Sequence, residues 1–233
     1  MRRLAFAVSL VLLAGCAEEP TAPTAPAISA AVSGGTAPKL SFFKGGGASI
    51  GWSSVGGSSP GDASNNVSLQ IVTGPNAGSG AGAFTFGKDE AANSIVGRRL
   101  GQINHLGFDS RGYLGAGSPR ITLTTVGDDG NHTYFLAAFH CNPGAPQGSW
   151  VTSNFLSSGC AVFRDGEIAA YAGLGAAALV ADANNETVTD WFLIQDEGPA
   201  IVFVDRLTVQ DWMWVRGGGP GIRSCLDVNP SCI

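Results

Sequence analysis

The chain has 233 residues, with 13 Lys and Arg against 18 Asp and Glu, which gives a formal net charge of −5. This acidic balance argues against a surface that binds phosphate groups or nucleic acid. Charged residues make up only 13% of the chain and glycines number 34, so the composition favours short strands and tight turns over helices.

The first 15 residues predict an export signal. Arg2 and Arg3 form a short positive start, and residues 4–13 are an apolar run too short to span a bilayer as a permanent helix. The run ends in Leu13-Ala14-Gly15-Cys16, which resembles the lipobox of bacterial lipoproteins. The resemblance implies cleavage before Cys16 and a lipid on its thiol, which would anchor the protein to the membrane of the cell envelope.

Residues 16–38 begin with the lipidated cysteine and continue as a tether rich in Ala, Pro and Thr. Such a segment has too few large apolar side chains to fold, and it is expected to be disordered. By the same resemblance, the residue after the cysteine helps to sort lipoproteins. Ala17 lacks the acidic side chain associated with inner-membrane retention, so the outer membrane is favoured in a host that has one.

The domain from residue 39 to 216 shows a series of predicted strands. Residues 40–43 and 49–52 are short strands, and Val67, Leu69 and Ile71 alternate with polar residues as in a half-buried strand. Further strands are predicted at 83–86, 100–108, 120–125, 133–140, 150–155, 161–163, 187–194 and 201–210. The regular spacing, with turn residues in each gap, predicts one all-β sandwich.

One segment departs from the strand pattern. Apolar residues between 167 and 179 recur at three or four positions, and Asp165 is placed to cap the start, so the spacing predicts one short helix. The last residues, 217–233, form a Gly-rich tail.

The order of these elements resembles extracellular jelly-roll sandwiches. The resemblance rests on 68–75 (SLQIVTGP), Arg99-Leu100-Gly101, Asp128-Asp129-Gly130, Trp150 and the closing strand 203–209 (FVDRLTV). That closing strand is similar to the end of many carbohydrate-binding jelly-roll modules. The resemblance implies a jelly-roll β-sandwich, and a fold of this kind hosts many functions.

Four cysteines remain besides Cys16, which is an even number for an oxidising compartment. Cys141 and Cys160 bracket adjacent predicted strands, and Cys225 and Cys232 would close a small loop in the tail. We expect two disulfides with this pairing.

Motifs for catalysis are weak. The three histidines have no close metal-ligand spacing, and the sequence contains no CxxC, HExxH or GxSxG motif. Glu90, Glu167, Glu186 and Glu197 fall in predicted turns or at element ends, where we interpret them as solvated loop charges rather than paired catalytic carboxylates. The 128–131 loop is interpreted as a hairpin turn rather than a calcium loop. No catalytic residue is assigned, which leans against an enzyme.

Sugar binding would need exposed rings and polar side chains. Trp150 and Trp191 lie in apolar strands and are predicted to be core residues. Trp212 and Trp214 follow the last strand and could form either a core lid or an exposed platform. Four charged residues flank the 100–108 strand and could line a polar groove or be scattered surface charges: Arg98, Arg99, Asp109 and Arg111.

Asp205 is conspicuous because it shares the parity of Ile201, Phe203, Leu207 and Val209, which we predict to be the buried face. Val202 and Val204 have the opposite parity, so a β-bulge could turn Asp205 outward. A buried carboxylate needs hydrogen bonds or a cation. The jelly-roll resemblance implies a structural calcium at Asp205, and the alternative is an aspartate that accepts backbone N–H bonds.

The leading hypothesis for function is a non-catalytic envelope module that binds a glycan or another envelope component. The alternatives are a small extracellular enzyme that acts on polysaccharide and a purely structural or interaction lipoprotein. The expected partners are the membrane, through the lipid, and a glycan, and nucleic acid is not expected.

Overall fold

The computed structural model describes residues 40–54, 56–58, 67–76, 78–85, 95–115, 117–146, 148–156, 160–170, 185–210, 212–214 and 222–224. All of them belong to the compact unit Thr36–Ile233. The signal segment, Cys16, the tether, and the pair Cys225 and Cys232 lie outside the described residues. No helix within the described part of the chain is long and apolar enough to cross a membrane.

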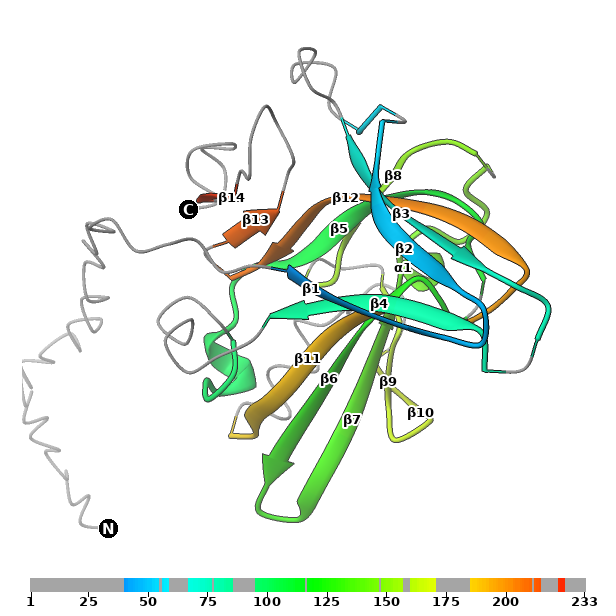
Figure 1. Ribbon diagram of the computed structural model, residues 1–233. Helices are drawn as coiled ribbons and strands as arrows, with labels where there is room; N and C mark the ends of the chain where they lie inside the picture. The colour runs from blue at the N-terminus through cyan, green and yellow to red at the C-terminus, as the bar shows by residue number, and fades with distance from the viewer. Residues whose placement is uncertain are drawn as a thin grey trace, which may run out of the picture. The chain divides into compact units, whose positions relative to one another are not determined.

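The first sheet joins seven antiparallel strands in the part of the chain described (Figure 1). In spatial order they are β1 (Leu40–Gly45), β4 (Gly80–Thr85), β11 (Thr187–Gln195), β6 (Arg120–Gly127), β7 (Gly130–Ala137), β9 (Val162–Arg164) and β10 (Glu167–Ala170). The β6–β7 hairpin is paired over its whole length, from Arg120 opposite Ala137 to Gly127 opposite Gly130. The hairpin interpretation of the 128–131 loop is therefore confirmed.

The second sheet is centred on β12 (Ala200–Val209), which pairs with β3 (Ser68–Thr73) on one side and β5 (Leu106–Gly112) on the other. β2 (Ser49–Ser53) flanks β3, and β8 (Val151–Asn154) flanks β5. β13 (Trp212–Trp214) pairs with the last residues of β12 and with β14 (Ile222–Ser224) from the tail. The sheet joins strands far apart in sequence, which is typical of jelly rolls.

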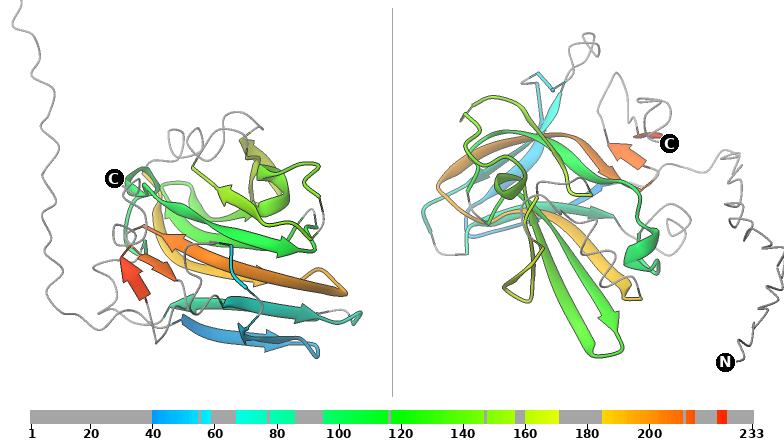
Figure 2. Two further views of the ribbon diagram at one scale, coloured as in Figure 1. Left: turned by 90° about the horizontal axis from the view of Figure 1, so that it is seen from above. Right: turned by 180° about the vertical axis from the view of Figure 1, so that it is seen from behind.

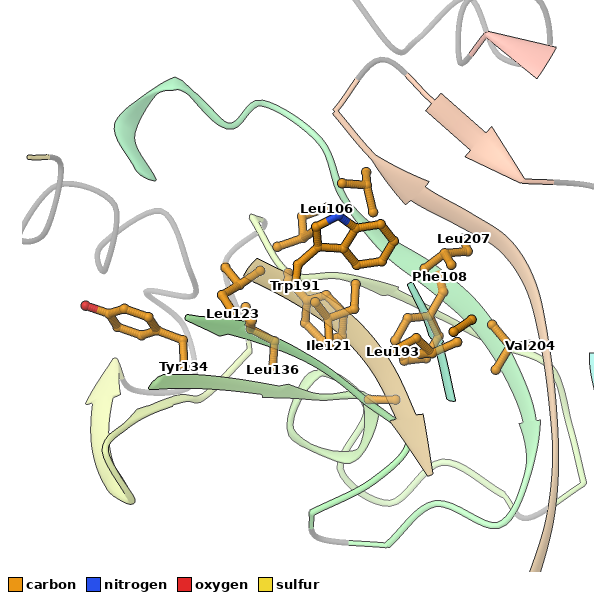
Figure 3. Packing of buried hydrophobic residues seen from close by; sticks show 14 of the residues in the cluster. Leu106, Phe108, Ile121, Leu123, Tyr134, Leu136, Trp191, Leu193, Val204 and Leu207 are labelled. Atoms are coloured by element: carbon orange, nitrogen blue, oxygen red, sulfur yellow. The ribbon is translucent and has the colours of Figure 1, made fainter. Parts of the chain in front are cut away.

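The core lies between the two sheets because alternate strand residues point inward from each (Figure 3). Phe108 and Val204 from the second sheet and Leu123 and Leu193 from the first are at most 2% exposed. Trp191 is also buried, which confirms its predicted core role, whereas Trp150 is half-buried. The described residues thus form an all-β sandwich with one short α-helix, as the sequence predicts.

The short helix lies elsewhere than predicted. α1 (Ala138–Cys141) directly follows β7, so the predicted 133–140 strand ends at Ala137. The predicted helix at 167–179 is wrong at its start, because residues Glu167–Ala170 form β10; residues 171–179 lie outside the described part. Asp165 and Gly166 have φ of 53° and 88°, and they form the two-residue turn between β9 and β10. Asp-Gly is a strong hairpin signal, and here it overrides the helical spacing.

The predicted 100–108 strand is also shorter than expected. Leu100–Gln102 form a 3-10 helix, η3, and β5 begins only at Leu106. The Gln102 side chain accepts the backbone N–H of Arg99 at 3.1 Å, and its own backbone N–H bonds to the Arg99 carbonyl at 2.9 Å. These local bonds compete with strand pairing.

The disulfide between Cys141 and Cys160 is present, which confirms that part of the prediction. It joins the end of α1 to the segment that leads into β9, and Cys160 is only 2% exposed.

The face prediction for the last strand is wrong over its first half. Val202 and Val204 point into the core, whereas Ile201 is 52% exposed. The register then shifts between Asp205 and Thr208, with Arg206 at φ 49°, so that Leu207 and Val209 also point inward. A β-bulge reverses parity in this way. Asp205 therefore lies on the outer face of the second sheet.

Candidate functional site

A polar pocket opens on the outer face of the second sheet, between β8, β5, β12 and β13. Its volume is about 220 Å³, and its polar lining residues are His105, Asp109, Thr152, Ser153, Asn154, Arg206 and Thr208. Gly107 lies opposite Asn154 on one side and Thr208 on the other, and it lines the pocket without a side chain. A Cβ at Gly107 would come within 2.3 Å of the Ser153 carbonyl oxygen, so the close approach of β5 and β8 requires glycine.

Two buried carboxylates lie side by side at this pocket. Asp109 of β5 is directly opposite Asp205 of β12, and their exposed fractions are 3% and 5%. Only Asp109 lines the pocket. The Ser58 hydroxyl contacts both side chains: it donates a short bond to Asp109 Oδ2 and lies 3.2 Å from Asp205 Oδ2. The Arg206 guanidinium lies 3.4 Å from Asp109 Oδ2.

Asp205 is held mainly by backbone donors. The N–H of Ser58 donates to Asp205 Oδ2 at 2.8 Å, and the N–H of Arg206 donates to Asp205 Oδ1 at 2.8 Å. Burial raises the pKa of Asp205, the neighbouring Asp109 raises it further, and the bonds from Ser58 and Arg206 oppose the change. The arrangement matches the hydrogen-bonded alternative of the sequence analysis, and calcium at Asp205 stays a prediction.

The structure separates the four charged residues that were grouped on the sequence. Arg111 shares the outer face of β5 with Asp109, and its Nε donates to the carbonyl of Gly148 at 2.9 Å. Arg98 and Arg99 instead lie at the start of β11, where the N–H of Val188 donates to the Arg98 carbonyl at 2.9 Å. The interpretation of all four as one polar groove is therefore wrong.

Of the two alternatives for the tryptophans after the last strand, the structure decides only for Trp214. Trp214 is 4% exposed and its ring lies 5.9 Å from that of Trp191, so it acts as the core lid. Trp212 belongs to β13, and its side chain lies outside the described residues. An apolar part of the pocket comes instead from Met213.

Sequence reasoning missed most of the pocket. Ser58 lies in a polar loop, and Arg206 comes into place only through the bulge. Thr152 and Asn154 belong to an edge strand in which their polarity reads as ordinary solvent exposure. Asp205 and Ser58 are 147 positions apart, so no local signal could have joined them.

A second charged cluster surrounds Glu186 at the turn end of the β6–β7 hairpin, which Figure 2 shows beside β11. Glu186 is 5% exposed, so its interpretation as a solvated loop charge is wrong. Its carboxylate accepts bonds from Tyr134 at 2.7 Å and from Thr125, and Arg164 Nη2 lies 2.9 Å from Oε1. Burial and the bond to Glu186 raise the pKa of Tyr134.

The other glutamates differ from one another. Glu167 is exposed as expected, and Glu90 lies outside the described residues. Glu197 is half-buried, and its Oε1 accepts the N–H of Gly117 at 2.8 Å.

His132 extends the second cluster to the turns. Its Nδ1 lies 2.7 Å from Asp165 Oδ2, and its Nε2 lies 2.9 Å from Asp129 Oδ1. Arg164 Nη2 is 3.2 Å from the other oxygen of Asp129. The bond to His132 lowers the pKa of both Asp129 and Asp165.

This second cluster has the residue types of a metal site but not the arrangement of one. One ligand atom each of Asp129, His132 and Glu186 lies within 4.8 Å of the other two. However, the guanidinium of Arg164 bonds to both carboxylates and already supplies a positive charge there. Both ring nitrogens of His132 face carboxylates, which is the arrangement of an imidazolium rather than of a metal ligand. The geometry is that of an ion-pair network.

No protein-family model, curated protein or solved structure matches the chain. The functional argument therefore rests on the chemistry of the pocket.

Proposed function

We propose that this protein is a lipid-anchored protein of the cell envelope whose sandwich binds a glycan, or another hydroxyl-rich envelope component, in the pocket on the outer face of the second sheet. The observation that carries the proposal is that seven polar residues line one cavity of about 220 Å³.

The donors and acceptors of the pocket suit hydroxyl groups. Asp109 offers only acceptor oxygens and Arg206 only donors, while the Thr152 and Thr208 hydroxyls and the Asn154 amide can do both. A sugar hydroxyl is itself both donor and acceptor, so each of these groups can pair with it. Met213 adds an apolar part that can contact the C–H face of a sugar.

The size of the pocket favours a single sugar unit over a long segment of chain. A cavity of about 220 Å³ is small beside typical ligand pockets of about 300 to 1,000 Å³. A ligand of this size gains specificity from a few fixed polar groups. Asp109 is fixed by Ser58 and Arg206, so little rotamer entropy is lost on binding.

The same geometry disfavours glycoside cleavage by the Asp109–Asp205 pair. Catalytic carboxylates flank the scissile bond, and in inverting enzymes they leave room for a water molecule. Here the Ser58 hydroxyl lies between the two carboxylates: it donates to Asp109 and lies 3.2 Å from Asp205 Oδ2. Because the space is filled, we favour binding over turnover.

The tether suits a module that reaches from a membrane. Residues 17–38, the predicted tether, lie between the proposed lipid on Cys16 and the sandwich. Replacing Cys16 with Ser should release the protein from membranes into the soluble fraction. Unchanged membrane association of Cys16→Ser would refute the anchor without bearing on the pocket.

The binding test is a glycan array followed by calorimetry on the glycans retained, with a reducing-sugar assay in parallel. Asp109→Asn removes the acceptor charge and should weaken binding at least tenfold, about 1.4 kcal/mol for one charged hydrogen bond. Thr152 is exposed, so Thr152→Arg should fill the pocket and abolish binding without disturbing the core. The matched control is Asp129→Asn, which makes the same chemical change outside the pocket.

The outcomes separate the three functional hypotheses. Binding without turnover that is lost in Thr152→Arg supports the proposal. Release of reducing sugar supports the hypothesis of a polysaccharide-active enzyme. Absence of both binding and sugar release supports a structural or interaction lipoprotein. Equal loss of binding in Asp109→Asn and Asp129→Asn would place the ligand elsewhere.

A further inference from the structure

His132 occupies an unusual position between two turns. It is 12% exposed and lies near the start of β7, with one carboxylate at each ring nitrogen. Asp129 belongs to the β6–β7 turn and Asp165 to the β9–β10 turn, so the ring connects two hairpins. An imidazolium has two N–H donors and satisfies both carboxylates, whereas a neutral imidazole has only one.

We propose that protonated His132 is a clasp for the tip of the β6–β7 hairpin, and that deprotonation releases Asp129 while the bond to Asp165 is kept. The proton leaves from Nε2 to water, and Nδ1 retains its proton. The bare lone pair of Nε2 then faces a carboxylate oxygen at 2.9 Å, which is repulsive.

The two carboxylates are not equally free to move. Asp165 Oδ1 accepts the backbone N–H of Thr133 at 2.8 Å, which fixes its second oxygen toward Nδ1. The Asp129 side chain is 66% exposed, and besides His132 it contacts Arg164 at 3.2 Å. The Asp129 side chain can therefore rotate away from His132 to bond with water and Arg164. The tip of the hairpin then becomes more mobile.

The charged groups around the ring set the direction of the effect. Asp165 and Asp129 raise the pKa of His132, and Glu186 adds to this from the start of β11. Partial burial and the Arg164 guanidinium on β9 oppose the rise. Because the pKa of His132 is raised in the folded protein, the clasp contributes fully to stability below the ordinary pKa of 6.5. This contribution is lost as pH rises through the pKa of the folded state. Each unit above 6.5 corresponds to about a tenfold tighter hold on the proton.

The test is an NMR titration of the ¹⁵N-labelled full chain, which reports both the midpoint and the tautomer of each histidine. His132 should titrate above 6.5 and should be the Nδ1–H tautomer at high pH, with faster motion of residues 128–130 in that range. His105 and His140 are internal references in the same spectra. A midpoint at or below 6.5, or an Nε2–H tautomer, would overturn the clasp.

Two conservative variants separate the roles of the carboxylates. Asp129→Asn should lower the midpoint and keep the Nδ1–H tautomer, whereas Asp165→Asn should lower the midpoint and lose the tautomer preference. Identical spectra from the two variants would contradict the assignment of the released partner. The wild-type titration decides the proposal by itself if either variant folds poorly, and none of these results depends on ligand binding.

Discussion

The two polar regions of this sandwich both bury a carboxylate, but they use its hydrogen-bonding capacity differently. Glu186 is saturated within the protein by Tyr134, Thr125 and Arg164. Among the described residues, Asp109 is bonded by Ser58 and contacted at a longer distance by Arg206, and it faces a cavity. A saturated carboxylate holds strands together, whereas one with free acceptor capacity can hold a ligand.

The difference is sharpest in the expected cost of removing Glu186. Glu186→Ala leaves the Tyr134 hydroxyl and the Arg164 guanidinium without their acceptor, and it should lower the free energy of unfolding by about 3 kcal/mol or more. Urea unfolding measures the loss. Asp129→Ala is the control, because it breaks the exposed side of the same network, where solvent screens the ion pairs, and should cost much less than Glu186→Ala. Equal losses would mean that burial does not set the strength of the network.

Sequence reasoning predicted most strands because alternation reports a sheet with one buried face. Its errors arose where local turn chemistry competes with periodicity, as at Asp165-Gly166, or where a bulge reverses parity, as at Arg206. Asp109 and Arg111 were proposed as site residues from their place beside a strand. Their partners come from distant strands and loops, and a single sequence does not encode register in any local pattern.

The disulfide offers a second way to test the contrast. Cys160 Sγ lies 3.4 Å from the carbonyl oxygen of Asn154, at the β8 wall of the pocket. Cys141→Ser with Cys160→Ser opens a loop closed over 19 positions and should lower the free energy of unfolding by about 3 kcal/mol. The double variant should also weaken ligand binding, because β8 loses a neighbouring support.

Calorimetry and urea unfolding of the double variant measure both effects, with the reduced wild type for comparison. The His132 titration should stay unchanged, since that cluster takes no contact from the disulfide among the described residues. A shifted His132 midpoint would show that the two regions are coupled.

The smallest of these expected effects on stability concerns Asp205, and the direction of its pH dependence is the informative part. Its folded pKa is raised, so its contribution to stability is greatest below the ordinary value of 3.8 and declines as pH rises through the folded value. Asp129 and Asp165 have lowered pKa values, so their contributions to stability are present above pH 3.8 and are lost as pH falls.

The Asp205→Ala variant leaves the N–H groups of Ser58 and Arg206 without their acceptor, and it should lower the free energy of unfolding by about 1 to 3 kcal/mol at neutral pH. Thermal melts at pH 4 and pH 7, each with calcium and with chelator, test both alternatives for this residue. If Asp205→Ala lowers the melting temperature equally with calcium and with chelator, the hydrogen-bonded aspartate is supported, because the backbone donors are present without a cation. A wild-type melting temperature that falls when calcium is chelated, with no such fall in Asp205→Ala, would instead place calcium at this carboxylate. The opposite pH dependence expected for Asp205 and for Asp129 and Asp165 would then no longer hold.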